Sequence, residues 1–188
     1  MADVRTRALR LLFACATLVA TSLFQQAQAQ ARLEVSEASV KAAFLYKFPG
    51  YIDWPASTFP SAAAPFTFGV MGQDDVAAEL ERLAAGKQWS GHPMAVRRVN
   101  GDNGLAGLQV LFVGRGAGDR VGAVVRAAQL PGLLVVTENE KGLTYGAAIN
   151  FVLLEDRVGF EVAPEAAERN GLRISSRMLA VARRVVQR

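Results

Sequence analysis

The chain has 188 residues, of which 51% are hydrophobic, and its 21 basic and 17 acidic residues give a formal net charge of +4. Three arginines and one aspartate lie in the first ten residues, which leaves +2 for the remainder and does not favour nucleic acid as a partner. A single cysteine and a single histidine exclude an internal disulfide, a thiolate metal cluster and a metal site built from several histidines.

Residues 1–29 have the pattern of a cleaved export signal. A positive head is followed by the uncharged apolar stretch Leu11–Phe24 and then by Ala27-Gln28-Ala29, the small-x-small pattern of a cleavage site. The apolar stretch is about fourteen residues long, whereas a helix needs about twenty to span a membrane. We therefore expect cleavage near Ala29. Cys15 lies too close to the positive head for lipidation, so we expect a mature chain without cysteine.

The first half of the remaining chain predicts two helices and two strands. Ser36 is a suitable N-cap for a helix that Pro49-Gly50 ends, with Val40, Phe44 and Phe48 on one face. The apolar run 65–72 predicts a buried strand, and Asp74 begins a helix that stops at Gly86. Residues 93–99 predict a second strand, which the polar loop 100–104 follows.

The second half repeats this rhythm and then changes it. Strand 108–114, helix 119–129 and strand 133–139 precede the segment 147–164, which predicts two strands joined tightly at 155–157. A short helix at 164–170 and a final helix from Ser175–Ser176 toward the C-terminus complete the list. Because the strands are continuously apolar, both faces of the sheet are expected to be covered. We predict one α/β domain over residues 36–186, with a mostly parallel sheet flanked by helices on both faces and a C-terminal antiparallel hairpin.

No catalytic constellation emerges from the polar residues. Gly114, Gly116 and Gly118 precede a predicted helix, but their spacing is not the dinucleotide pattern, and Asp119 would repel a phosphate. We therefore interpret the segment as a glycine-rich turn with Asp119 as N-cap. His92 and acid pairs such as Glu138/Glu140 lie at predicted turns, which favours solvation over catalysis. We predict no enzyme activity, no cofactor and no metal site.

Trp54, Glu161 and Arg173 are candidates for binding. Trp54 follows the first helix, where its ring either caps the edge of the core or forms a contact surface. Glu161 alternates with apolar neighbours, so it lies either on the solvent side of a strand or in a groove that faces a ligand or partner. Arg173 alternates in the same way and is a possible counter-charge for Glu161.

The order of several segments resembles the YfiR family of exported proteins over residues 38–184. The segments are "VKAAFLYKFPGYIDWP", "PFTFGVMG", "LQVLFVG", "GLLVVTENE" and "GAAINFVLLEDRVGFEVAPEAAERNGLRISSRMLAVAR". The most specific parts are the aromatic helix ending in Trp54-Pro55 and the closing run from Ile149-Asn150-Phe151 to Leu172–Ser175.

The resemblance implies a function in the periplasm. It implies a homodimeric negative regulator that binds the periplasmic sensor domain of an inner-membrane diguanylate cyclase, YfiN, and restrains cyclic di-GMP synthesis and biofilm formation. An outer-membrane lipoprotein, YfiB, would sequester the regulator. The resemblance also implies Trp54, Phe151, Glu161 and Arg173 as binding residues.

One departure and two alternatives accompany the resemblance. Characterised repressors of the family contain disulfides, so redox control by that route is excluded for a mature chain without cysteine. The main alternative function is a periplasmic small-ligand sensor. A hydrolase or nucleotide enzyme has only the glycine turn and the acid pairs in its favour.

Overall fold

The structure is a computed structural model that describes residues 36–101, 104–155 and 157–187. The predicted export signal, its cleavage point at Ala29 and Cys15 lie outside the described residues. The chain divides into Met1–Ser36, of which only Ser36 is described, and Glu37–Arg188, which holds every element below. Among the described helices, none has both the length and the apolar character needed to cross a bilayer.

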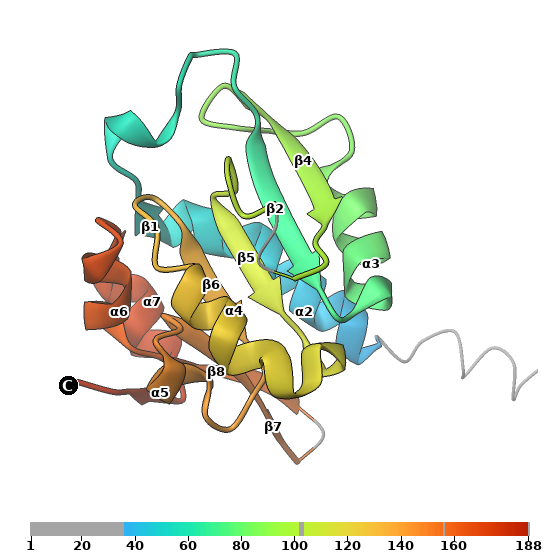
Figure 1. The fold of residues 1–188 in the computed structure, drawn as a ribbon, viewed down its shortest axis with the longest axis vertical. Helices are drawn as coiled ribbons and strands as arrows, with labels where there is room; N and C mark the ends of the chain where they lie inside the picture. Colours follow the sequence, from blue (N-terminus) through green and yellow to red (C-terminus); the bar gives the residue numbers. More distant parts are fainter. Residues whose placement is uncertain (1–35, 102–103, 156, 188) are drawn as a thin grey trace, which may run out of the picture. The chain divides into compact units, whose positions relative to one another are not determined.

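The second unit alternates helices and strands along the chain (Figure 1). The helices are α2 (Glu37–Lys47), α3 (Asp74–Ala84), α4 (Val121–Ala127), α5 (Gly142–Tyr145), α6 (Pro164–Arg169) and α7 (Ser176–Val181), with 3-10 turns η1 (Phe48–Tyr51), η2 (Ala56–Thr58) and η3 (Arg115–Arg120). The strands are β1 (Ile52–Asp53), β2 (Phe66–Met71), β3 (Gln88–Trp89), β4 (His92–Arg98), β5 (Val110–Val113), β6 (Leu134–Thr137), β7 (Ile149–Leu154), β8 (Arg157–Val162), β9 (Arg173–Ile174) and β10 (Arg184–Val185).

In the described part of the chain, the main sheet has eight strands in the order β10-β8-β7-β6-β5-β2-β4-β3. Strands β4, β2, β5, β6 and β7 run parallel to one another, β3 pairs antiparallel with β4, and β7 and β8 form the antiparallel hairpin. The two-stranded sheet β1–β9 is separate. The predicted α/β domain with its C-terminal antiparallel hairpin is therefore confirmed.

Helices cover both faces of this sheet and bury a separate core on each. Side chains alternate along β5: Val110 and Phe112 belong to one core, and Leu111 and Val113 belong to the other. The first core also contains side chains of α2, α3, α6 and α7, and the second contains those of α4. Figure 1 shows α2 and α4 on opposite sides of the central strands. Two buried faces explain why the central strands have continuous apolar sequences.

The largest difference from the predicted elements is at the C-terminus. The final helix begins where expected, since Ser175 is its N-cap and accepts a hydrogen bond from the amide of Met178, but it ends at Val181. The chain then turns into β10, where the amides of Arg183 and Val186 donate to carbonyls of β8. The free edge of β8 thus captures a segment whose apolar spacing also fits a helix.

Two smaller expectations about single residues are wrong. Asp119 does not cap α4: it is an exposed residue within η3, and Arg120 takes the N-cap position without a side-chain hydrogen bond. His92 is not a freely solvated turn residue, because its ring stacks on Phe59 at 3.8 Å and its Nδ1 lies 2.6 Å from the carbonyl oxygen of Ala64. His92 therefore fastens the loop after η2 to the start of β4.

Candidate functional site

A pocket forms where the β7–β8 hairpin extends past the shorter strands beside it. Strand β6 ends at Thr137, which lies opposite Asn150, and β7 continues for four more residues. The pocket lies beyond the carboxyl end of β6 and has a volume of about 360 Å³. One wall is apolar and consists of Phe151, Val152, Leu153 and Val158, and the other wall is charged.

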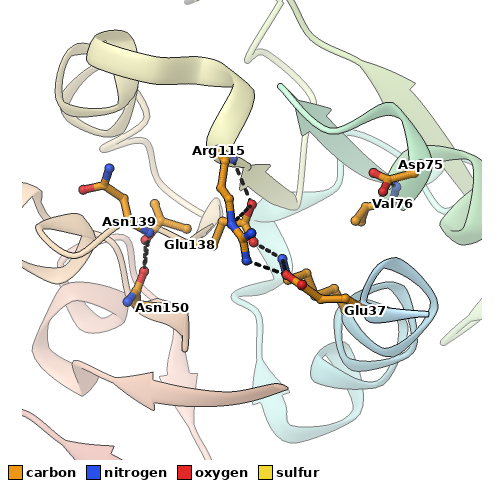
Figure 2. A network of polar contacts seen from close by, with 9 residues as sticks. Glu37, Asp75, Val76, Arg115, Glu138, Asn139 and Asn150 are labelled. Carbon is orange, nitrogen blue, oxygen red and sulfur yellow. Dashed lines mark hydrogen bonds and ion pairs between the residues drawn. The ribbon is translucent and has the colours of Figure 1, made fainter. Parts of the chain in front are cut away.

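Four residues of the charged wall form a closed ring of two cations and two anions, and Glu140 lies in the same wall outside the ring. Lys41 pairs with Glu37 at 2.5 Å and also with Glu138, and Arg115 pairs with Glu37 at 2.5 Å and with Glu138 at 3.4 Å. The backbone amide of Arg115 donates a further hydrogen bond of 2.9 Å to Glu138. Figure 2 shows Arg115, Glu138 and Glu37 converging from three different segments. The ring therefore joins the first turns of α2 to the ends of β5 and β6.

Burial is uneven around this ring. The side chains of Lys41 and Glu138 are only 2% and 3% exposed, whereas that of Arg115 is 60% exposed. A buried charge is tolerated only when a partner compensates it, so Lys41 and Glu138 depend on each other. The hydrogen bond from Lys41, followed by the charges of Lys41 and Arg115, lowers the pKa of Glu37, although partial burial acts in the opposite direction.

The floor of the pocket is a buried amide. Oδ1 of Asn150 accepts hydrogen bonds from the Thr137 hydroxyl at 2.8 Å and from the Asn139 amide at 3.0 Å. Gly142 packs directly on this pair, since a Cβ at position 142 would lie 2.9 Å from Oδ1 of Asn150. No described residue accepts a hydrogen bond from Nδ2 of Asn150, which leaves this donor for a molecule in the pocket.

The glycine-rich turn fills the neighbouring crevice rather than opening it. Strand order reverses between β2 and β5, the position at which open α/β sheets bind ligands beyond the strand ends. Here the amide of Gly116 donates to the carbonyl of Gly72, and a Cβ on Gly116 would lie 2.5 Å from that oxygen. A Cβ on Gly114 would likewise lie 2.8 Å from the Gln73 side chain. Gly114 and Gly116 therefore serve close packing of two loops, as the interpretation of this segment as a turn anticipates.

The predicted binding residues do not form a single site. Phe151 lines the pocket at the hairpin but is mostly buried, with its ring among Phe44, Phe48 and Phe112. Trp54 lies at the edge of the core, where its indole N–H donates to the carbonyl of Gly132 at 2.9 Å. Phe151 and Trp54 are thus placed by packing, and only parts of their surfaces face solvent.

Glu161 and Arg173 do not pair with each other. Glu161 forms an ion pair with Arg184 of β10 at 2.9 Å, and this contact raises the pKa of Arg184. Arg173 is 81% exposed and lies 3.4 Å from Asp53 on the neighbouring strand β1. Arg173 and Trp54 line a shallow pocket of about 370 Å³ together, so the structure brings two of the four predicted residues to one place.

Sequence reasoning missed the charged ring. Lys41 lies within the first helix, four residues after Glu37, and this spacing alone signals only an ordinary helical ion pair. The interpretation of Glu138 as a solvated turn acid is wrong, because its side chain is almost completely buried beside Lys41. Within the described ranges, no three His, Cys, Asp or Glu side chains gather where they could hold a metal ion.

Comparison with known proteins agrees with this fold. Residues 38–183 of this sequence match the sequence model of a protein family that is described as YfiR/HmsC-like. A crystal structure of a conserved domain protein from Vibrio cholerae O1 biovar eltor matches with a TM-score of 0.50 and 13% identity, over 80% of this chain and 60% of that one. This chain thus spans three fifths of the length of that protein, and at such low identity the match shows the fold alone. No curated protein matches the sequence.

Proposed function

The chain belongs to the YfiR/HmsC-like family, and from this membership we propose that it is a periplasmic negative regulator. It is exported, it binds the periplasmic sensor domain of an inner-membrane diguanylate cyclase, and it thereby restrains cyclic di-GMP synthesis and biofilm formation. The observation that carries the proposal is the extent of the family match, which begins in α2 and ends just before β10.

The described surface is compatible with a role in protein binding. Large apolar side chains are exposed at several places, among them Tyr51 after α2, Leu153 and Leu154 at the hairpin, and Val181 at the end of α7. Exposed aromatic and aliphatic side chains are the usual anchors of protein interfaces. We propose that Trp54, Phe151, Glu161 and Arg173 contribute to binding through the parts of their surfaces that remain accessible.

Direct binding tests the proposal. The exported protein is purified after expression of the full chain and titrated against the periplasmic domain of a diguanylate cyclase encoded beside it. We expect saturable binding at micromolar concentration or below, and we expect reduced cyclic di-GMP synthesis when the protein is added to the full-length cyclase in vesicles. If neither binding nor inhibition occurs at these concentrations, the proposal fails.

The assembly of the regulator is a second part of the proposal. The protein forms a homodimer, and an outer-membrane lipoprotein competes with the cyclase for it. Sedimentation equilibrium of the purified protein measures the first point, and a single species with the mass of one chain at high concentration would contradict it. The competition is measured by adding the purified periplasmic domain of the lipoprotein to the inhibited cyclase. We expect the cyclase activity to return.

A small-ligand sensor is the second candidate, favoured by the pocket that Trp54 and Arg173 line together. Arg173 beside the indole ring suits an anionic group and an aromatic body, and Asp53 and Glu168 in the same lining suit a cationic group, so an aromatic amino acid fits the pocket. A ligand at 100 times its dissociation constant stabilises the protein by about 2.7 kcal/mol, which thermal unfolding detects readily. If amino acids and aromatic metabolites cause no shift that depends on Arg173, this candidate is set aside.

A further inference from the structure

We propose that the pocket beneath the β7–β8 hairpin binds a segment of a partner protein that carries an apolar side chain next to a basic residue. The inference rests on the proposed function in one respect, namely that the occupant belongs to a protein. It specifies where that protein binds and what its contacting segment contains.

The apolar wall of the pocket continues onto the open surface. Leu153 and Leu154, at the end of β7, are 46% and 50% exposed, and Val152 and Val158 are half-buried beside them. Phe151 supports these side chains from the core. A site that enclosed a small molecule would place its apolar groups inside the cavity, whereas here they extend past its rim. This arrangement fits a side chain that enters the pocket while the segment bearing it covers the leucines.

The charges around the pocket favour a basic partner. Lys41 and Arg115 are balanced by Glu37 and Glu138 within the ring, so the ring attracts neither sign strongly. Glu140 also lines the pocket, is exposed, and has no ion-pair partner among the described residues. The lining therefore carries a net charge of about −1, and this excess is complementary to a lysine or arginine beside the apolar anchor.

A backbone contact completes the match. Asn150 is 4% exposed, and both hydrogen bonds to its Oδ1 come from the protein itself. Its Nδ2 has no acceptor in the described part of the chain and is not a fully buried atom, so it is able to donate into the pocket. The carbonyl oxygen of a peptide group in the pocket supplies that acceptor.

Short peptides test the inference without the cyclase. The exported protein, labelled with ¹⁵N, is titrated with acetyl-Lys-Leu-Phe-Lys-amide, with the same peptide carrying glutamates in place of lysines, and with acetyl-Lys-Gly-Gly-Lys-amide. We expect saturable shifts of the amide signals of Asn139, Asn150 and Leu153 with the first peptide, binding about tenfold weaker with the second, and none with the third. The absence of shifts at these residues, or equal binding of the first two peptides, overturns the inference.

Surface variants localise the contact. Leu153→Ser and Glu140→Lys change exposed residues, so the fold is expected to persist. Each variant is expected to bind the first peptide about fivefold to tenfold more weakly than the unmodified protein does. Leu130→Ser and Glu168→Lys are matched controls: Leu130 lies between α4 and β6, before the start of β6 rather than after its end, and Glu168 lies on α6. Both controls should bind like the unmodified protein, and equal losses in all four variants contradict the inference.

The same variants separate this inference from the proposed function. If the cyclase domain binds the unmodified protein and the Leu153→Ser and Glu140→Lys proteins equally well, the docking site is wrong and the regulatory function stands. If the peptides bind at the pocket as expected but no cyclase domain binds, the regulatory function is wrong and the docking site stands.

Discussion

Replacing Lys41 with methionine tests whether the charged ring holds the carboxyl edge of the sheet together. Methionine has a similar length but no charge, so Glu138 loses its buried partner and retains only the amide of Arg115 and an ion pair at 3.4 Å. Removing one member of a buried ion pair costs about 3–5 kcal/mol because the other charge is left uncompensated. Since Arg115 still compensates Glu138 in part, we expect a loss near 3 kcal/mol, which lowers the melting temperature by roughly 6–12 °C.

Urea denaturation of three proteins measures this effect. Lys41→Met is compared with the unmodified protein and with the double variant Lys41→Met/Glu138→Gln. In the double variant both buried side chains are neutral, so we expect its stability to return to within about 1 kcal/mol of the unmodified protein. The reasoning is refuted if Lys41→Met alone costs less than about 1 kcal/mol, or if the double variant is as unstable as the single one.

Acid titration examines the exposed part of the same ring. Lys41 holds the pKa of Glu37 below its ordinary value of 4.5, so near that pH the folded protein binds fewer protons than the unfolded chain. The contribution of Glu37 to stability is therefore complete above the unfolded-state pKa and is lost as the pH falls through the lower folded-state pKa. The stability difference between the unmodified protein and Glu37→Gln should shrink as the pH falls below about 5. A difference that is the same at pH 7 and pH 3 would contradict the assignment.

Two further predictions concern loop packing and the C-terminal strand. Gly116→Ala should cost about 1–3 kcal/mol in urea denaturation because its Cβ would lie 2.5 Å from the oxygen of Gly72, whereas Gly50→Ala, with no atom within 4 Å, should change stability by less than about 0.5 kcal/mol. Arg184→Gln removes the ion pair between β10 and β8, so the amide of Val186 should exchange its hydrogen faster; unchanged exchange would show that backbone hydrogen bonds alone hold β10.

The long strands could be predicted because each has a strong local signal. Every residue of β2, β5 and β6 is buried, so each strand has an almost entirely apolar sequence, with Thr67 and Thr137 as the polar residues. The two-residue strands β1 and β9 have no such signal, since no periodicity exists over two residues. The failure at β10 has a different cause: hydrogen-bond acceptors on β8 decide its conformation, and they are remote from it in sequence.

The candidate site was less predictable because it consists of distant pairs. Lys41 and Glu138 are separated by 97 positions, and each has an ordinary local explanation, as a helical lysine and as a turn acid. Only the placement of α2 against the ends of β5 and β6 makes them buried partners. For Trp54 the sequence left two environments open, the edge of the core and a contact surface, and the structure packs its ring against the core.

The close contact between the loops that follow β2 and β5 has a consequence for protein engineering. Similar α/β sheets hold phosphates at this position, but here main-chain atoms already occupy the volume that such a ligand would need. Exchanging side chains therefore cannot create a nucleotide site at this position. Lengthening one of the two loops is the smallest alteration that would create the necessary room.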